Sequence, residues 1–393
     1  MIRILATLSV IVFFALPNSV IGNTSYSVSF NFYNQKVTIR YSPGIVINAP
    51  ISPSERTISN YYKLIKRENY TSLLQDLRYY RNHLLLNDWL LYKMVYLTAR
   101  EIISSDNQLQ VELLCWFILN ELGYETRVTY LHDQVYVYAY TIDEIYEIPL
   151  ITDQGKTFAN LTSFRSGKTA EMEELFLLNY RPRSNFKPFT FLLSFHPIFP
   201  KKIKQRLVEF SYQGRNYSFL LKIDQNIIQI LEDYPYFAEE QYLEFAFSKT
   251  AFESLIPPLK EALKDKGQIE AIELMVSFTR SSFDYKEDKS FFGKSKPMVA
   301  EEVLYYPYSD CEDRSALFYQ LVKILLDLPM IIIAFDDHLT IAVALENFEG
   351  QAIEYKNKKY YICDPTGPAN SSTIGFFPKG YENKAFKIIG SYK

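Results

Sequence analysis

The chain has 393 residues, of which 48% are hydrophobic and 22% are charged. A chain of this length and apolar content can bury one large core or several smaller ones, which excludes a largely disordered protein. The formal net charge of −3 at pH 7 gives no electrostatic reason to expect nucleic acid or an anionic membrane as a partner.

The first 22 residues have the layout of a signal peptide. Arg3 supplies a positive charge, residues 4–16 form an apolar run, and Val20-Ile21-Gly22 is a loose version of a cleavage site. The run is too short to span a bilayer, and the alternative interpretation is a buried first helix or strand. The sequence predicts an exported protein, secreted or periplasmic, that begins near residue 23 and has no transmembrane segment after the leader is removed.

One order of patterns occurs twice along the chain. The segment FNFYNQKVTI from Phe30 resembles FSYQGRNYSF from Phe210, a shift of 180 residues. Further on, the segment that begins at Asn120 resembles the segment that begins at Leu325, a shift of 205 residues, so about two dozen residues were inserted before the second segment. We interpret this as a tandem duplication with a first unit at 23–165, a linker at 166–204 and a second unit at 205–393 that opens with a β-hairpin. The alternative is a chance alignment of two α+β stretches of similar composition.

The second unit predicts a helix, a long loop, a second helix and three strands. Apolar residues at helical spacing cover 268–283, and residues 282–307 are polar, Lys-rich and aromatic without a sustained period. Long loops in compact domains are usually functional. A second helix runs from Cys311 to Leu328 and ends at Pro329, and strands are predicted at 330–335, 338–345 and 359–363.

Only three cysteines occur, Cys115, Cys311 and Cys363, so the chain has no disulfide framework. Cys311 stands at the predicted start of a helix, His338 at the start of a strand and Asp364 at the end of another. A thiol attacks a carbonyl as thiolate, and it needs a base within hydrogen-bond reach and a third group that orients the imidazole. His338 and Asp364 lie at equal sequence distance from residue 351, so an antiparallel pairing of their strands permits them to face each other.

These motifs resemble the catalytic core of the transglutaminase-like superfamily. The resemblance is carried by DCEDRSALF around Cys311, by a histidine that opens an apolar strand, and by YYICDPT around Asp364. It implies an α+β, papain-like core at 268–393, in which the helix that carries Cys311 packs on an antiparallel sheet. It also implies a triad of Cys311, His338 and Asp364, and a cysteine hydrolase, protease or acyltransferase that acts on peptide or glutamine-type amides through a thioester acyl-enzyme.

The acidic residues beside Cys311 have two interpretations. The helix N-terminus favours a thiolate, whereas Asp310, Glu312 and Asp313 are like charges that raise its pKa. Ser309 and Glu312 fit an S-x-x-E capping box, which gives Glu312 a structural role. The DCED form is also similar to bacterial periplasmic transglutaminase-like proteases, some of which bind calcium through acidic residues that flank the cysteine, and this resemblance implies Asp310 and Glu312 as calcium ligands.

Other residues near the motif suggest further roles. Tyr305, Tyr306 and Tyr308 are candidates to line the groove for a peptide or protein substrate. A zinc site of Cys311, His338 and Cys363 is chemically conceivable, but consecutive strand residues face opposite sides, so Cys363 should face away from Asp364 and into the core.

We expect the first unit to be a copy that has lost the triad. At the 205 shift, Cys311 corresponds to Asp106 and His338 to Asp133, while Cys115 lies in the apolar run LLCWFIL and should be a core residue. The sequence therefore leaves two classes of function: an exported cysteine enzyme, and a non-catalytic binding or scaffold protein that retains the same fold.

Overall fold

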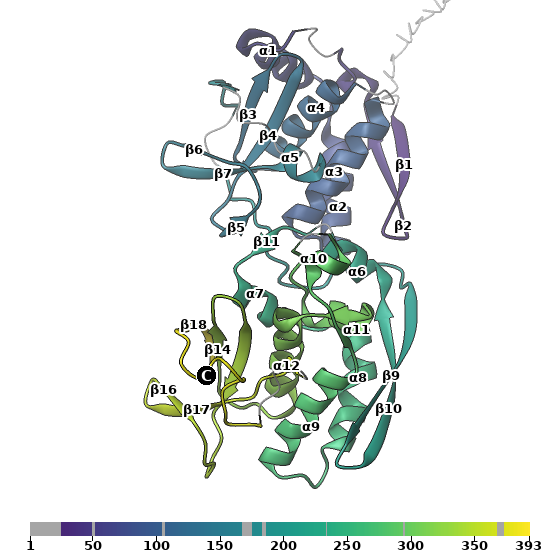
Figure 1. Cartoon of the computed structure of the whole chain (residues 1–393). Coiled ribbons are helices and arrows are strands. Elements are labelled where there is room, and N and C mark those ends of the chain that lie inside the picture. The colour runs from purple at the N-terminus through teal and green to yellow at the C-terminus, as the bar shows by residue number, and fades with distance from the viewer. Residues whose placement is uncertain are drawn as a thin grey trace, which may run out of the picture.

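The computed structural model describes residues 25–48, 52–103, 107–166, 175–182, 186–232, 234–293, 295–367 and 373–393. The predicted leader therefore lies outside the described residues. The chain forms two lobes that follow each other along the sequence (Figure 1). The described fold is mixed α+β, as expected, and none of its helices is both long and apolar enough to cross a bilayer.

The described part of the first lobe places a β-hairpin, five α-helices and a short 3-10 helix beside an antiparallel sheet. The sheet has the strand order β6-β7-β4-β3-β8. The elements are β1 (Tyr26–Phe32), β2 (Gln35–Tyr41), the short helix η1 (Pro43–Ile45), α1 (Glu55–Ile65), α2 (Thr71–His83), α3 (Asp88–Ile103), α4 (Gln108–Glu121), β3 (Thr126–Leu131), β4 (Gln134–Tyr140), β5 (Ile145–Tyr146), β6 (Leu150–Asp153), β7 (Lys156–Asn160), α5 (Leu161–Ser166) and β8 (Phe176–Leu177).

The second lobe also begins with a β-hairpin and ends with an antiparallel sheet. This sheet has the order β16-β17-β15-β14-β18. The elements are β9 (Ile203–Tyr212), β10 (Arg215–Asp224), α6 (Gln225–Glu232), β11 (Tyr236–Phe237), α7 (Glu239–Glu244), α8 (Lys249–Ala262), α9 (Gln268–Ser281), β12 (Asp284–Tyr285), α10 (Asp288–Phe291), α11 (Ala300–Tyr305), β13 (Tyr308–Ser309), α12 (Cys311–Leu325), β14 (Met330–Ala334), β15 (Leu339–Val343), β16 (Ala352–Tyr355), β17 (Lys358–Ile362) and β18 (Lys387–Tyr392).

The two sheets have the same topology. In each lobe a long helix, α4 or α12, leads into the first strand of a central antiparallel pair and packs on the second strand of that pair, β4 or β15. In each sheet the next hairpin, β6-β7 or β16-β17, extends the sheet from that second strand, and the last strand, β8 or β18, pairs with the first. The two lobes therefore arrange equivalent elements in the same order.

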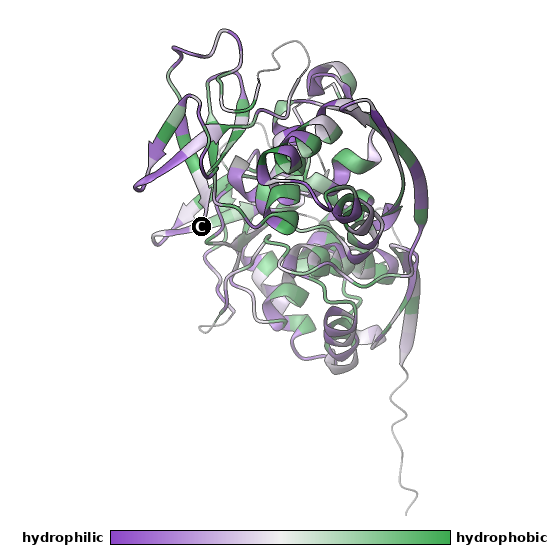
Figure 2. Ribbon diagram, turned by 90° about the horizontal axis from the view of Figure 1, so that it is seen from below, coloured by the Kyte–Doolittle hydropathy of each residue, from purple (hydrophilic) through white to green (hydrophobic). Residues whose placement is uncertain are grey.

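Helix α12 is the centre of the second core. Leu317, Phe318, Leu321 and Val322 are fully buried, and the helix is covered on most of its circumference by α7, α9, α11 and β15. Each such side chain contributes roughly 1.5–3 kcal/mol of burial free energy, which fixes the helix rigidly. Figure 2 shows apolar segments gathered on the central helices and a largely polar hairpin at the edge of the molecule.

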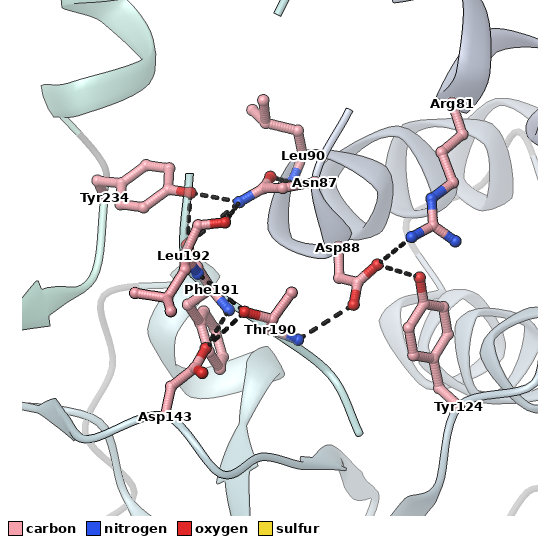
Figure 3. A network of polar contacts seen from close by, with 10 residues as sticks. All are labelled: Arg81, Asn87, Asp88, Leu90, Tyr124, Asp143, Thr190, Phe191, Leu192 and Tyr234. Carbon is pink, nitrogen blue, oxygen red and sulfur yellow. Dashed lines mark hydrogen bonds and ion pairs between the residues drawn. The ribbon is translucent and has the colours of Figure 1, made fainter. Parts of the chain in front are cut away.

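Where the structure describes it, the predicted linker at 166–204 packs on the first lobe. Strand β8 belongs to the first sheet, and Phe189 and Phe191 are fully buried in the first core. Figure 3 shows how polar groups fix the segment: the Asp143 carboxylate accepts hydrogen bonds from the Phe191 backbone N–H at 2.6 Å and from the Thr190 hydroxyl at 2.9 Å. The segment has no regular period, so its apolar residues gave no sign of which core they fill.

The lobes are packed against each other. Ile227, Ile230 and Leu231 of α6 belong to the core of the first lobe, although α6 follows the second hairpin in the sequence. Strand β11 pairs with β5 of the first lobe, and the Tyr234 hydroxyl donates to the carbonyl oxygen of Phe191 at 2.6 Å (Figure 3). The junction between the lobes is therefore an apolar interface with specific hydrogen bonds.

Candidate active site

Cys311 is the first residue of α12. Strand β13 ends at Ser309, and Asp310 has an extended backbone that makes it the N-cap, so the helix begins at Cys311. The Asp313 carboxylate accepts a hydrogen bond from the Asp310 backbone N–H at 3.0 Å. The predicted capping pair of Ser309 and Glu312 is therefore wrong by one residue, because DxxD supplies the cap in place of SxxE.

Arg314 fixes the start of α12 to the surrounding loops. Its side chain is 1% exposed, and its Nε donates to the Ser309 hydroxyl at 3.1 Å. Its two terminal nitrogens donate to the carbonyl oxygens of Phe283 and Thr366. A planar guanidinium can satisfy three acceptors at fixed angles, so Arg314 joins the end of α9, strand β13 and the loop after β17 around the thiol.

His338 and Asp364 lie in contact on the sheet that faces α12. His338 closes the β14–β15 turn one residue before β15 begins, and its Nε2 lies 3.1 Å from Asp364 Oδ1. Ala342 pairs with Ile362, and continuing this register places Thr340 opposite Asp364. The expected pairing of residues 338 and 364 is thus two residues out of register, and His338 reaches the carboxylate diagonally. Thr340 donates its hydroxyl to the same oxygen at 3.1 Å.

The Cys311 thiol lies beside the residue that follows His338. The backbone N–H of Leu339 lowers the pKa of the thiol, against the larger effects of burial and of Glu312 that raise it. Because Nε2 of His338 is committed to Asp364, Nδ1 is the ring nitrogen left for the thiol. Cys311 is 8% exposed, His338 6% and Asp364 1%, so each of the three groups is buried. Among the described residues the thiol is hydrogen-bonded to Glu312 and His338 to Asp364, and no hydrogen bond joins the thiol to His338.

The thiol is protonated in this arrangement. Its S–H donates to Glu312 Oε2, with Sγ and the oxygen 2.8 Å apart. Burial raises the pKa of Cys311 far above its ordinary value, and the charges of Glu312 and Asp310 raise it further. Burial and the contact with Glu312 therefore both disfavour the thiolate form of Cys311.

Three carboxylates converge on the N-terminal side of the thiol. Oxygens of Asp288, Asp310 and Asp313 lie within 4.8 Å of one another. Asp310 is 8% exposed, and its Oδ1 has no hydrogen-bond partner among the described residues. Burial and the nearby Glu312 raise the pKa of Asp310 to about 8, and burial with the nearby Asp310 raises the pKa of Asp313.

This cluster fits a hard divalent cation. Calcium takes six to eight oxygen ligands and favours carboxylates, and a buried carboxylate oxygen without a donor is a free ligand position. Of the two predicted ligands, Asp310 belongs to the cluster, whereas the Glu312 Oε2 is occupied by the thiol. The partners of Asp310 in the cluster are Asp288 and Asp313.

The three predicted groove tyrosines contact helices α6 and α10. The Tyr306 hydroxyl donates to Glu232 Oε1 at 3.0 Å, and the Tyr305 hydroxyl accepts from Gln225, so both contact α6. The Tyr308 ring packs 5.0 Å from that of Phe291. The substrate-groove prediction is therefore not supported by their contacts. The tyrosines whose pKa is raised in part by the Cys311 thiolate are Tyr285 and Tyr381.

The remaining cysteines are core residues. Cys115 and Cys363 are fully buried, and the Cys363 thiol donates to the Tyr361 carbonyl oxygen at 3.4 Å, on the opposite side from Asp364. All three cysteines are free. Among the described residues, the zinc set of Cys311, His338 and Cys363 does not form a cluster.

Sequence reasoning missed several residues that surround the triad. Asp288 lies in the loop whose length marked it as functional, but nothing in the loop distinguishes Asp288 from Asp284 or Glu287. Arg314 is part of the quoted DCEDR motif and was overlooked because arginine is rarely fully buried. Tyr381 lies in a loop without a recognisable pattern.

Comparison with known proteins adds no family to this picture. No protein-family model matches the chain, and no curated protein or solved structure matches it either.

Proposed function

We propose that the second lobe is a transglutaminase-like cysteine hydrolase or acyltransferase, exported from the cell, that acts on peptide or glutamine-type amides. The observation that carries the proposal is the joint placement of the three groups: Cys311 at a helix N-terminus, beside the Leu339 N–H, with His338 Nε2 bound to Asp364. The implied leader at 1–22 supports a secreted or periplasmic location, and a peptide or protein is the implied substrate.

The chain's own residues supply a complete acyl-transfer cycle. His338 Nδ1 takes the thiol proton, and the Cys311 sulfur attacks the amide carbonyl carbon to form a tetrahedral intermediate. The backbone N–H of Cys311 has no intrahelical partner and is available to the oxyanion. The imidazolium, oriented by Asp364, then protonates the leaving amine as the C–N bond breaks. The product of this half-reaction is a thioester on Cys311.

The second half-reaction reverses the proton movements. Water or an amine attacks the thioester carbon, His338 Nδ1 takes the proton of the attacking group, and the sulfur leaves and regains a proton from the imidazolium. Water gives hydrolysis, and an amine gives acyl transfer. Both outcomes use the same three residues.

Calcium is the cofactor that the carboxylate cluster fits, with Asp288, Asp310 and Asp313 as ligands and Glu312 next to them. When bound, a divalent cation neutralises the carboxylates that raise the pKa of the thiol. Asp288 belongs to α10 and Asp313 also accepts the Met298 backbone N–H at 2.8 Å, so the same residues would link α10 and Met298 to the start of α12.

We also interpret the two lobes as a tandem duplication in which the first copy is degenerate. The support is the shared strand order and the shared position of α4 and α12. In the first lobe the turn that corresponds to Phe335–His338 contains His132 and Asp133, both exposed, whereas His338 is buried. Asp106, the predicted counterpart of Cys311, lies outside the described residues.

The decisive experiment is labelling combined with turnover. Purified protein is incubated with iodoacetamide over a range of pH, and the labelled cysteine is identified by peptide mass spectrometry. The proposal expects labelling of Cys311, loss of labelling rate in His338→Ala, and cleavage or transamidation of a casein substrate that is absent in Cys311→Ala.

A non-catalytic scaffold is the second candidate, and the closed, protonated state of the thiol favours it. The same experiment separates the two functions. If Cys311 reacts no faster than a free peptide thiol at any pH or calcium concentration, and casein remains unchanged, the scaffold function stands and the enzyme function fails.

A further inference from the structure

The stretch from residue 379 to residue 387, which leads into β18, carries one buried side chain on an otherwise exposed surface. From residue 379 to residue 387 every residue is exposed except Tyr381, which is 8% exposed. A tyrosine in a polar surface loop normally keeps at least its hydroxyl edge in water. The burial of Tyr381 alone therefore indicates that this ring fills a specific place on the body of the lobe.

The Tyr381 ring lies against the imidazole of His338, the proposed catalytic base. The Tyr381 ring centroid lies 5.0 Å from that of His338 and 4.9 Å from that of Phe335. Both contact distances are those of packed aromatic pairs. The Tyr381 ring therefore covers the imidazole of His338, which is 6% exposed, and the neighbouring Cys311 is 8% exposed.

The segment around Tyr381 is weakly attached to the rest of the lobe. The Tyr381 backbone N–H donates to the Pro378 carbonyl at 2.9 Å, and the Lys384 N–H donates to the Tyr381 carbonyl at 3.2 Å. Among the described residues, no backbone hydrogen bond joins 379–386 to a strand or helix. Gly380, with φ +89°, permits the turn before Tyr381.

Side chains supply the remaining attachment. Phe386 packs on Phe335 with ring centroids 5.8 Å apart. The Lys384 Nζ lies 2.9 Å and 3.0 Å from the two Asp337 oxygens, and it also lies over the Tyr381 ring. Asp337 immediately precedes His338, so the ion pair connects the segment to the turn that carries the catalytic base. Both partners are largely exposed, and an exposed ion pair holds a contact with little free energy.

We propose that residues 378–386 form a flap over the active site, in which Tyr381 is the gate residue for substrate and acyl acceptor and the Asp337–Lys384 ion pair is its latch. The proposal rests on the proposed function, because it treats Cys311 as the group being gated. A segment with few body contacts opens at low cost, while the tyrosine gives the closed state its specific fit. The substrate class that the gate selects is an extended peptide able to displace an aromatic ring from the imidazole face.

The test measures access to Cys311 and needs no substrate. Intact-protein mass spectrometry follows alkylation by iodoacetamide, a small reagent, and by N-ethylmaleimide, a bulkier one. Cys311→Ala supplies the background, because Cys115 and Cys363 are fully buried. Tyr381→Ala is expected to raise the alkylation rate by about ten-fold or more, and more for the bulkier reagent, whereas Tyr381→Phe keeps the ring and should stay within two-fold of the wild type. Phe376→Ala, an exposed aromatic in the same connection, is the matched control.

The Asp337–Lys384 ion pair is tested with a variant and a matched control. Lys384→Ala is expected to raise the rate by about two- to five-fold, and high salt should raise the wild-type rate but leave Lys384→Ala unchanged. Lys393→Ala removes an ion pair with Asp327 of nearly the same exposure at a distant site and should have no effect. This measurement tests the flap even if Tyr381→Ala does not fold.

The outcomes separate the flap from the proposed function. If Tyr381→Ala folds and its alkylation rate equals that of the wild type, the flap is overturned. If Tyr381→Ala does not fold, the flap is overturned when neither high salt nor Lys384→Ala changes the alkylation rate. If casein turnover still depends on Cys311 in that case, the proposed function survives. Faster alkylation in Tyr381→Ala without turnover of casein in any variant supports the flap and counts against the enzyme.

Discussion

The two lobes place different chemistry on the same scaffold. At the start of α4, the Gln108 amide and Arg165 donate to Glu112, and the Thr162 hydroxyl donates to the same carboxylate at 2.8 Å. Thr162 stands two residues after β7, as Asp364 stands two residues after β17. Where the second lobe has a thiol, an imidazole and a carboxylate, the first has a buried ion pair whose partners are satisfied.

The connection before the helix distinguishes the lobes most clearly. In the first lobe only residues 104–107 separate α3 from α4, whereas residues 282–310 separate α9 from α12. The longer connection contributes Asp288 to the carboxylate cluster and Tyr285 to the surroundings of the thiol. The sheet and the helix position a helix N-terminus in both lobes, and the longer connection of the second lobe adds acidic and aromatic side chains beside that N-terminus.

The largest expected effect is on turnover and is confined to the second lobe. Cys311→Ala should lower the rate of amide turnover by about 10⁴-fold or more, because the nucleophile, base and orienting group act as a unit. Cys115→Ala removes the cysteine of the first lobe and should leave turnover within two-fold, although it costs core stability. Activity retained in Cys311→Ala and lost in Cys115→Ala would reverse the roles assigned to the lobes. The measurement is initial velocity on a casein-derived peptide.

The next effect is on the stability of the first lobe. Arg165→Ala leaves Glu112, which is 1% exposed, without its ion-pair partner, and breaking a buried pair costs about 3–5 kcal/mol. We expect a loss of this size in the free energy of unfolding, measured by urea denaturation. The control is Glu253→Ala, which breaks the exposed Lys249 pair and should change stability by less than about 0.5 kcal/mol. An equally small loss in Arg165→Ala would show that the ion pair does not hold the first lobe together.

Calcium should stabilise the second lobe by an intermediate amount that depends on pH. At a free concentration 100-fold above Kd, a ligand that binds only the native state adds about 2.7 kcal/mol, which is measured as a rise in Tm. Asp288→Asn should abolish the rise, while Glu287→Gln, the exposed neighbour, should retain it. If calcium does not change the Tm of the wild-type protein, the carboxylate cluster does not bind calcium.

The sign of the pH effect follows from Asp310. Its pKa in the native state is raised to about 8, above its unfolded value, so the native state binds the proton more tightly. This contribution to stability is fully present below the unfolded pKa, near pH 4, and is lost as the pH rises through about 8. Because a cation binds the ionised carboxylate, the calcium-dependent rise in Tm should grow over the same range. Asp310→Asn should weaken the pH dependence of the stability and of the calcium-dependent rise in Tm, both measured by thermal unfolding from pH 5 to pH 9.

A smaller effect concerns the reactivity of the thiol. Glu312→Gln removes the charge that lies against Cys311, which lowers the pKa of the thiol and increases the thiolate fraction at a given pH. We expect the iodoacetamide rate at pH 8 to rise about ten-fold, equivalent to one pKa unit. Asp336→Asn, an exposed carboxylate near His338, should change the rate by less than two-fold. A slower reaction in Glu312→Gln would mean that Glu312 activates the thiol instead of suppressing it.

The sequence predicted the large elements of the second lobe because their patterns are local. Helix α9 was expected at 268–283 and lies at Gln268–Ser281, and the strands that flank His338 and Asp364 lie within two residues of their expected bounds. The choice of Cys311, His338 and Asp364 also rested on local motifs. The capping residues were misplaced by one position because Ser309 and Asp310 are both good N-caps, and only the tertiary position of β13 decides between them.

Other features depended on contacts that no local pattern contains. The predicted linker at 166–204 contains Phe189 and Phe191, which fill the first core, and its sequence shows no period that would reveal this. The strand register was estimated from equal spacing around residue 351, but the β16–β17 hairpin shifts the pairing by two residues. The tyrosine nearest to His338, Tyr381, comes from a loop far along the chain, while the tyrosines next to Cys311 in sequence face α6 and α10.

The smallest expected effect tests the register itself. Thr340 is the second residue of β15, and Val135 is the second residue of β4, so Thr340→Val introduces the first-lobe residue into the second lobe. The substitution keeps the shape but removes the hydroxyl that donates to Asp364 Oδ1 at 3.1 Å, a bond worth about 0.5–1.5 kcal/mol. Since Asp364 also binds His338 through that oxygen, we expect kcat to fall about two- to ten-fold while KM changes little, because the loss affects orientation of the base and not substrate contacts.

Thr98→Val, the same change at a fully buried threonine of the first lobe, controls for stability and should leave kcat unaltered. An unchanged kcat in Thr340→Val would show that the His338–Asp364 contact alone orients the imidazole, and that the difference between Thr340 and Val135 does not separate an active lobe from an inactive one.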